Sequence, residues 1–363
     1  MVEGICWAGL DVHASRTSIA VLDTASGEVI KRTVLGRPHE AIGVLEQLPG
    51  PVRAVYEAGP TGYGLARRSR PGLQIEVCAP GDIAAGGGAS SRVKTDARDA
   101  LKLARLLVAG QLTMVTVPTV EQEQVRDLVR AREDVRADLM RARHRLGKLL
   151  LRREIYFPGK DRSWTVKHLQ WLASLRFEDR STEATFQDYL HGHDTLLARR
   201  DRLDEHIEQV ATSCSLAWEV GRLRCLKGID TLSALGLAAE TRGLERFHKP
   251  MHVSAFLGIV PSEHSSGERR RVGAITKAGS QHGRRLLVEA AWHYRKPPRT
   301  GAALRRRQDG ADPAAIDCAW RAQRRLHQRW RDLHQIRGKR STVTNIAVAR
   351  ELAHFCWEIT RPE

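Results

Sequence analysis

Short apolar runs alternate with polar residues along the first hundred residues, and this period of two is the pattern of half-buried β-strands. The runs predict five strands, at residues 6–13, 16–24, 28–35, 51–58 and 73–80. Stretches with helical spacing predict helices at residues 39–48, 61–70 and 95–110. The order of these elements, β-β-β-α-β-α-β-α, is that of an α/β RNase H-like fold.

From residue 118 onward the apolar residues recur every three or four positions, which indicates a long amphipathic helix. Eight positions from Val125 to Leu149 follow the a/d spacing of a coiled coil, and all except Arg132 are apolar. A second helical run at about residues 193–210 can pair with the first. The pattern therefore fits two structures equally, an intramolecular helical hairpin and a dimerising coiled coil.

These changes of pattern divide the chain of 363 residues into three regions, as expected for a length too great for one hydrophobic core. We predict an α/β domain at residues 1–112, a helical coiled-coil dimerisation region at 113–218 and a basic, mainly α-helical domain at 219–363. No apolar stretch is long enough to cross a bilayer, and the first residues lack the pattern of a secretion signal. We therefore expect a cytoplasmic protein with no membrane partner.

The positive charge of the chain is concentrated near its carboxyl end. The sequence has 59 lysine and arginine residues against 42 aspartate and glutamate residues, a formal net charge of +17. Residues 1–112 contain 13 basic and 11 acidic residues, a difference of +2, whereas residues 264–363 contain 22 and 9, a difference of +13. A field of this kind favours a polyanionic partner, and nucleic acid is the simplest such partner.

The cysteines and histidines give little sign of a metal site or a disulfide framework. The six cysteines contain no CxxC pair, and we predict that they are small buried hydrophobic residues. His191 and His193 form an HxH pair without further ligands nearby in the sequence. We predict that both histidines lie on the surface of a helix, because a metal site needs more ligands than these two.

Four carboxylates are placed where the predicted fold brings them together. Asp11 and Glu57 each end an apolar strand, and we expect these strands to be neighbours with both ends at one edge of the sheet. Asp96 and Asp99 open the helix at 95–110, and a spacing of three places them on one helical face. Acidic residues also stabilise a helix N-terminus without any metal. Four crowded carboxylates nevertheless predict a Mg²⁺ site, since two such ions can hold the attacking and leaving oxygens of a phosphodiester.

A turn-rich stretch of the basic region contains a candidate nucleophile. Ser265 and Ser266 precede Gly267, and a serine beside a glycine can stand on an exposed turn, open to a phosphate. Three arginines follow, and their guanidinium groups can hold the phosphate and offset charge at the phosphorus. The predicted nucleic-acid-binding residues are Arg269, Arg270, Arg271, Lys277, Arg284 and Arg285. Ser-Ser-Gly is also the composition of an ordinary loop.

Four motifs, in order along the chain, resemble those of one family of mobile-element enzymes. They are GLDVHAS, YEAGPTGYGL, RVKTDARDALKLARLL and GIVPSEHSSGERRRVGAITKAG. Together they resemble the Piv/MooV-type DEDD transposases of the IS110 insertion-sequence family, and the resemblance covers nearly the whole chain. The chain departs from the family pattern at Ser280, where the family commonly has asparagine.

The resemblance implies a RuvC-like first domain and a transposase domain with a nucleophilic serine, best matched by Ser266. The implied catalytic metal ligands are Asp11, Glu57, Asp96 and Asp99, with Mg²⁺ as the cofactor. A coiled-coil insert implies a homo-oligomer, either a dimer or a tetramer. Donor and target DNA would be the substrates, and a structured bridge RNA from the ends of the element would pair with both.

Three other interpretations remain open. A RuvC-like, metal-dependent, structure-specific endonuclease would cut with activated water and form no covalent serine intermediate. A non-catalytic nucleic-acid-binding protein would occupy the ends of the element, although the complete set of four carboxylates speaks against it. An actin-like sugar kinase shares the aspartate of the first strand, but the sequence lacks the second glycine-rich phosphate motif of such kinases.

Overall fold

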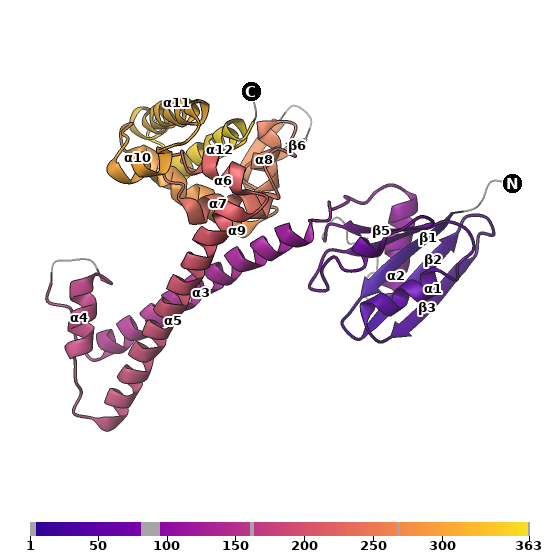
Figure 1. Ribbon diagram of the computed structural model, residues 1–363, viewed down its shortest axis with the longest axis horizontal. Coiled ribbons are helices and arrows are strands. Elements are labelled where there is room, and N and C mark those ends of the chain that lie inside the picture. Colours follow the sequence, from indigo (N-terminus) through magenta and orange to yellow (C-terminus); the bar gives the residue numbers. More distant parts are fainter. Residues whose placement is uncertain (1–4, 81–94, 160–162, 267–268, 362–363) are drawn as a thin grey trace. The chain divides into compact units, whose positions relative to one another are not determined.

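The computed structural model describes residues 5–80, 95–159, 163–266 and 269–361, without the side chains of residues 264–266 and 269–271. The chain forms two compact units, Met1–Thr119 and Val120–Glu363 (Figure 1). None of the described helices is long and apolar enough to cross a membrane. The separation of residues 113–218 from residues 219–363 stays a prediction.

A five-stranded sheet forms the centre of the first unit (Figure 1). Its strands are β1 (Cys6–Val12), β2 (Arg16–Asp23), β3 (Val29–Leu35), β4 (Val52–Glu57) and β5 (Leu73–Cys78), in the spatial order β3-β2-β1-β4-β5. β2 pairs antiparallel with β1 and with β3, whereas β1, β4 and β5 run parallel. The mixed sheet with helices that an RNase H-like fold requires is confirmed.

The two faces of this sheet pack against different helices. On one face, Ala8 and Leu10 of β1 pack with the buried residues of α1 (Ala41–Leu45). On the other face, Val55 of β4 packs with the buried leucines of α2 (Asp96–Val108). Because the side chains of a strand alternate between faces, the odd-numbered residues of β1 and β4 belong to the face covered by α2.

The prediction of a helix at residues 61–70 is wrong, because this segment is a turn followed by a short 3-10 helix, η2 (Ala66–Arg68). Gly62 has a φ of 68°, a left-handed conformation outside the helical region. The Tyr56 hydroxyl donates to the Gly62 carbonyl oxygen at 3.0 Å and accepts from the Ala66 N–H at 3.4 Å. These hydrogen bonds fix the turn directly after β4, where Glu57 ends the strand.

Two long helices of the second unit, α3 (Val120–Arg152) and α5 (Arg180–Ser213), lie side by side, with α4 (Val166–Ser174) near their far ends (Figure 1). Arg132, the one polar residue among the eight predicted a/d positions of α3, donates to both carboxylate oxygens of Asp204 on α5, at 2.6 and 3.1 Å. Six of these a/d positions are buried within this single chain: Val125, Val135, Leu139, Ala142, Leu146 and Leu149. The helical hairpin covers the apolar stripe, so coiled-coil dimerisation is not confirmed.

The prediction that His193 lies on the surface is wrong, whereas His191 is exposed as predicted. The His193 ring is fully buried and stacks on Trp164, with 5.1 Å between the ring centroids. Its Nδ1 lies 3.0 Å from a carboxylate oxygen of Asp194, and Arg143 Nε donates to its Nε2 at 3.5 Å. Trp164, which precedes α4, covers this part of α5, and the spacing along α5 alone does not reveal that contact.

The rest of the second unit consists of shorter helices and one β-hairpin around a common core. The helices are α6 (Ala217–Leu223), α7 (Thr231–Thr241), α8 (Pro250–Phe256), α9 (Gln281–Ala291), η4 (Trp292–Arg295), α10 (Ala302–Gln308), α11 (Pro313–Trp330), η5 (Arg331–Ile336) and α12 (Ser341–Ile359). The hairpin is β6 (Pro261–Ser266) with β7 (Arg269–Ile275), where the sequence predicts turns instead of strands. Trp330 and Tyr294 are buried in the core. The mainly α-helical character of this region is confirmed.

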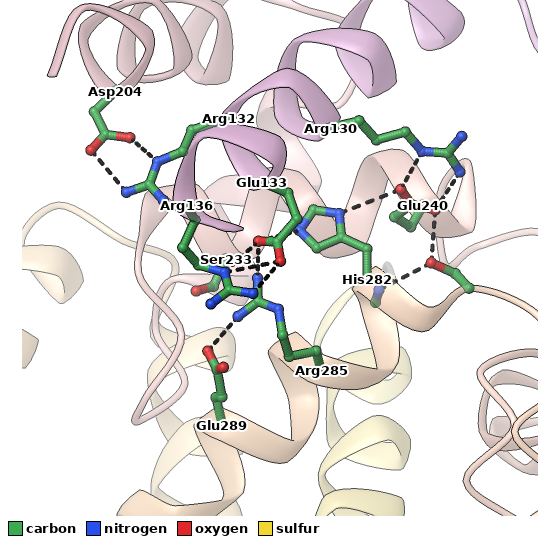
Figure 2. Close-up of polar contacts among 12 residues, drawn as sticks. Arg130, Arg132, Glu133, Arg136, Asp204, Ser233, Glu240, His282, Arg285 and Glu289 are labelled. Atoms are coloured by element: carbon green, nitrogen blue, oxygen red, sulfur yellow. Dashed lines mark hydrogen bonds and ion pairs between the residues drawn. The ribbon is translucent and has the colours of Figure 1, made fainter. Parts of the chain in front are cut away.

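A buried carboxylate on α7 joins α3 to α9 (Figure 2). The side chain of Glu240 is only 2% exposed, and Arg130 donates to both of its oxygens, at 2.8 and 3.0 Å. Ser280 Oγ donates to Glu240 at 2.8 Å, and His282 Nδ1 lies 3.4 Å from it. Burial would raise the pKa of the Glu240 carboxyl, but these contacts hold it well below its ordinary value. Ser280 also accepts from Gly283 N–H at 3.0 Å, so this serine serves as the N-cap of α9.

A second carboxylate, Glu133 on α3, completes the network in Figure 2. Glu133 pairs with Arg136 on its own helix, at 2.7 Å, and with Arg285 on α9. His282 Nε2 lies 3.9 Å from a Glu133 oxygen, so the imidazole stands between the two carboxylates. Charged hydrogen bonds that are partly buried are stronger than those in water. We infer that this network fixes the first half of α3 to α7 and α9.

We expect the buried Glu219 of α6 to make the stability of the protein depend on pH. The Leu244 backbone N–H donates to both of its carboxyl oxygens, each 3.2 Å from the nitrogen, and burial raises its pKa from 4.5 to about 7. Between pH 4.5 and about pH 7, the Glu219 carboxyl of the folded protein therefore holds its proton more often than that of the unfolded chain. The free energy of unfolding should therefore fall as pH rises through this window, by about 3 kcal/mol in total.

We expect Glu219→Gln to remove this fall, because the amide stays neutral at every pH. Urea unfolding at pH 5 and at pH 8 measures the difference, with Glu208→Gln, at an exposed position of α5, as the control. The control should keep the pH dependence of the unaltered protein. An equal loss of stability in all three proteins would mean that Glu219 does not cause it.

Candidate functional site

Two of the predicted carboxylates end adjacent strands. β1 pairs parallel with β4, and Leu10 lies opposite Tyr56 in this register. Asp11 and Glu57 are the next residues along the two strands, and both belong to the face covered by α2. Adjacent strands are about 4.8 Å apart, so the two residues lie at one edge of the sheet.

Helix α2 reaches the same edge because it packs directly on β1. At Gly9, a Cβ atom would overlap the carbonyl oxygen of Ala100 and lie 2.6 Å from the backbone nitrogen of Ala104. Glycine is the residue that permits this approach of helix and strand. The first turn of α2, which contains Asp96 and Asp99, is thereby held near Asp11.

A compact polar group forms where β1 and α2 meet. The ligand atoms of Asp11, His13 and Asp96 all lie within 4.8 Å of one another. His13 Nε2 is 3.5 Å from Asp11 Oδ2 and 3.9 Å from Asp96 Oδ2. The guanidinium of Arg16, at the start of β2, donates to the same oxygen of Asp96. All four side chains are at least partly exposed, so the group is accessible from solvent.

The electrostatics of this group fit a divalent cation. Burial raises the pKa of the Asp11 carboxyl, while His13 opposes the rise. The negative charges of Asp96 and Asp99 raise the same pKa further, because like charges disfavour ionisation. Carboxylate oxygens crowded at an open edge are the donors that hard divalent cations prefer. The residues present therefore fit a divalent metal.

The four predicted ligands are not equivalent in the structure. Asp11 and Asp96 belong to the close group, and Asp99 is near enough to affect the charge of Asp11. Glu57 is exposed at the end of β4. Among the described residues, neither Asp99 nor Glu57 is part of the group that lies within 4.8 Å.

Sequence reasoning missed His13 and Arg16. A signal for His13 was available, because it follows Asp11 by two residues, and a strand continued by one residue would place both on one face. Arg16 has no such signal. Its position depends on the tight turn between β1 and β2, in which the His13 N–H donates to the Arg16 carbonyl oxygen at 2.9 Å. The turn returns the chain to the acidic edge, and residue spacing alone does not predict its geometry.

The candidate nucleophile lies on the β-hairpin of the second unit. Ser266 is the last residue of β6 and pairs with Arg269, the first residue of β7, while Ser265 pairs with Arg270. Gly267, on which the predicted exposed turn depends, lies outside the described residues, as do the side chains of both serines and of the arginines. The backbone register sets each serine opposite an arginine.

The other predicted nucleic-acid-binding residues have different surroundings. Lys277 is exposed, with a left-handed φ of 57°. Arg284 donates to two backbone carbonyl oxygens, both at 2.9 Å. Arg285 pairs with Glu133 and Glu289. The charge of Lys277 faces solvent, whereas the two arginines hold α9 to its neighbours. A role of these three residues in nucleic-acid binding stays a prediction.

Sequence comparisons match nearly the whole chain. The signature of the transposase IS116/IS110/IS902 family matches residues 220–304, and a DEDD transposase signature of the IS110 type matches residues 8–155. The chain is 39% identical over 361 residues to y4qE of Sinorhizobium fredii, which is named as a transposase, and this match covers 98% of the chain and 88% of that protein. It is 31% identical over 342 residues to the transposase for insertion sequence element IS1533 of Leptospira borgpetersenii, with coverage of 92% and 98%.

The two matched ranges coincide with the two candidate sites. The range 8–155 contains all four predicted metal ligands, and the range 220–304 contains both candidate serines. The region of α5 lies in neither range, although the full-length relatives span it.

Proposed function

Because the chain belongs to the IS116/IS110/IS902 family of transposases, we propose that it moves an insertion sequence with a Mg²⁺-binding acidic edge and a serine nucleophile. Membership of the family makes it a DNA transposase, and the DEDD signature implies dependence on a divalent metal. The observation that carries the finer proposal is the meeting of Asp11, His13 and Asp96 at the end of β1.

Asp11 and Asp96 are the residues that would hold Mg²⁺ most directly, with Glu57 and Asp99 as the further carboxylates of the edge. Their oxygens suit this hard cation better than the nitrogen of His13 does. The chemistry that Mg²⁺ supplies when bound is polarisation of a phosphodiester and stabilisation of its leaving oxygen. His13 lies 3.5 Å from Asp11, so its proposed task is to orient that carboxylate by a hydrogen bond.

The proposed strand transfer uses Ser266 as the nucleophile. Its hydroxyl oxygen would form a bond to a DNA phosphorus while the bond from that phosphorus to a sugar oxygen breaks, and the sugar oxygen leaves as a hydroxyl. A sugar hydroxyl of the partner strand would then attack the same phosphorus and release the serine. Positive charge from Arg269, Arg270 and Arg271 would offset the charge that develops on the phosphate.

The proposed partners are donor DNA, target DNA and a structured bridge RNA, bound by a homo-oligomer that is a dimer or a tetramer. The excess of positive charge in residues 264–363 supports a nucleic-acid surface there. Sequencing the RNA that copurifies with the protein tests the proposed bridge RNA. A recurring structured RNA encoded beside the gene is expected, and random cellular RNA would contradict the proposal.

A metal-dependent endonuclease without a covalent intermediate is the second candidate. The observation in its favour is that Asp11, His13 and Asp96 all belong to the first unit, so the acidic edge forms without the serine hairpin. Such an enzyme would cut DNA with water and leave a free end.

The covalent intermediate distinguishes these two functions. Purified protein is incubated with Mg²⁺ and an end-labelled, nicked DNA substrate, and the products are separated on a denaturing gel. We expect a labelled band shifted by the mass of the protein, which disappears after protease treatment or when a chelator is present from the start. Cut DNA without any protein-linked band would exclude the serine mechanism and favour the endonuclease.

A further inference from the structure

A second concentration of basic side chains lies at the turn between α6 and α7, away in sequence from the serine hairpin. We call it the turn cluster, and its members come from that turn, from the end of η4 and from α10. They are Arg224, Lys227, His293, Lys296 and Arg307. None of them is among the predicted nucleic-acid-binding residues.

Direct contacts hold the turn cluster together. Lys227 Nζ donates to the Pro297 carbonyl oxygen at 3.0 Å, which places it beside Lys296, the preceding residue. Arg307 Nε donates to the Arg224 carbonyl oxygen at 3.1 Å. Each contact uses one N–H group of a side chain that has several N–H groups, so donors remain for another ligand.

Gly228 allows the turn to approach η4. Its φ is 85°, and a Cβ atom there would lie 2.7 Å from the Ala290 carbonyl oxygen and 2.9 Å from His293 Cδ2. A larger residue would push the turn away from the end of α9. The backbone geometry therefore keeps Lys227 close to His293 and Lys296.

The turn cluster lacks the carboxylates that neutralise other basic residues of this unit. Arg321 pairs with Asp317 and Glu358, whereas within the described part of the chain no carboxylate lies within ion-pair distance of Lys227, Lys296 or Arg307. The charge of Asp230 acts on Arg307 and His293 from beyond ion-pair distance, and its carboxylate accepts from the Ser233 N–H at 2.8 Å as the N-cap of α7.

Two further observations point to uncompensated charge. Burial lowers the pKa of the Lys227 ammonium, and the neighbouring Lys296 lowers it further. The Nε of Arg224 is buried and has no hydrogen-bond partner among the described atoms. Cations held together at the surface without counter-charges form a site for an anion with several acceptor oxygens.

We propose that the turn cluster binds phosphates of a nucleic-acid backbone. A phosphodiester provides the charge and the acceptor oxygens that these side chains leave unmet, and a backbone contact needs no particular base. This binding site does not depend on the metal and serine chemistry proposed above, only on the protein handling nucleic acid. DNA and RNA share this chemistry, so the test uses both.

The test compares the double variant Lys227→Gln/Lys296→Gln with the control Arg321→Gln/Arg325→Gln. Both remove two positive charges from the same unit, but the control arginines are already paired with carboxylates. Affinity for a duplex DNA and for a single-stranded RNA, both of unrelated sequence, is measured at several salt concentrations. Circular dichroism verifies that both variants are folded.

Each lost phosphate contact makes the slope of log affinity against log salt shallower by about 0.9 for duplex DNA and about 0.7 for a single strand. We expect the turn-cluster variant to lose nearly two such contacts with at least one substrate, and the control to keep the slope of the unaltered protein. The substrate whose slope changes shows whether the turn cluster binds a DNA or an RNA backbone. Unchanged slopes with both substrates, or an equal change in the control, would overturn the proposal. A missing covalent adduct would leave this result unaffected.

Discussion

Asp11→Asn is expected to reduce strand transfer by about a thousandfold, which corresponds to about 4 kcal/mol of transition-state stabilisation. Asparagine has nearly the shape of aspartate, so the packing of β1 against α2 should survive. It lacks the negative charge, however, and Asp11 belongs to the only group of three ligand atoms within 4.8 Å among the described residues. Glu57→Gln should have an effect in the same direction, because Glu57 ends the adjacent strand at the same edge.

Two measurements separate a lost metal site from a lost fold. Mg²⁺ should raise the thermal unfolding temperature of the unaltered protein and leave that of Asp11→Asn unchanged, because a ligand stabilises only the state that binds it. Glu28→Gln removes an exposed carboxylate of the same unit and serves as the control, with normal strand transfer expected. Strand transfer at a normal rate in Asp11→Asn and Glu57→Gln would disprove the assignment of the acidic edge.

Ser266→Ala is expected to bind DNA and RNA normally and to form no covalent adduct, whereas Ser265→Ala should keep partial activity. Successive residues of a strand belong to opposite faces, so the two serines of β6 are not interchangeable. Alanine removes the hydroxyl oxygen of the proposed nucleophile without changing the charge of the hairpin. The labelled, protease-sensitive band on a denaturing gel is the measurement.

The pair of serine variants gives two clear contrary outcomes. If Ser265→Ala loses the band and Ser266→Ala keeps it, Ser265 is the nucleophile. If both variants keep the band, the covalent bond is made by another residue. Equal affinity of both variants for unrelated duplex DNA is the control, since a hairpin that failed to fold would lower that affinity as well.

The sheet and its acidic edge could be predicted because they follow from local patterns. A strand of period two that ends in a carboxylate places that carboxylate at the end of the strand, whatever the rest of the chain does. Asp96 and Asp99 are found in the same way, from a spacing of three at a helix start. These rules locate each residue within its own element, and the predicted RNase H-like order of the elements then brings Asp11 and Asp96 near each other.

The missed features depend on how elements pack. The strands β6 and β7 were not predicted because serine, arginine and glycine dominate them, and their cross-strand pairing outweighs the weak strand propensity of such residues. His193 was assigned to the surface because helical spacing does not reveal that Trp164 covers it. The partner of the α3 stripe was ambiguous for the same reason, since one apolar face fits a neighbour in the same chain or in another.

The contact at Gly9 means that the tolerance of a position to substitution need not follow the chemistry of its side chain. Gly9 carries no functional group, yet any larger residue would push α2 away from β1 and would displace Asp96 and Asp99 together. A single methyl group there would disturb two carboxylates at once, whereas a change at Glu57 alters only one. In a survey of all substitutions, changes at this glycine should reduce strand transfer as much as changes at the acidic residues do. The glycine only sets the distance between the two elements that carry those residues.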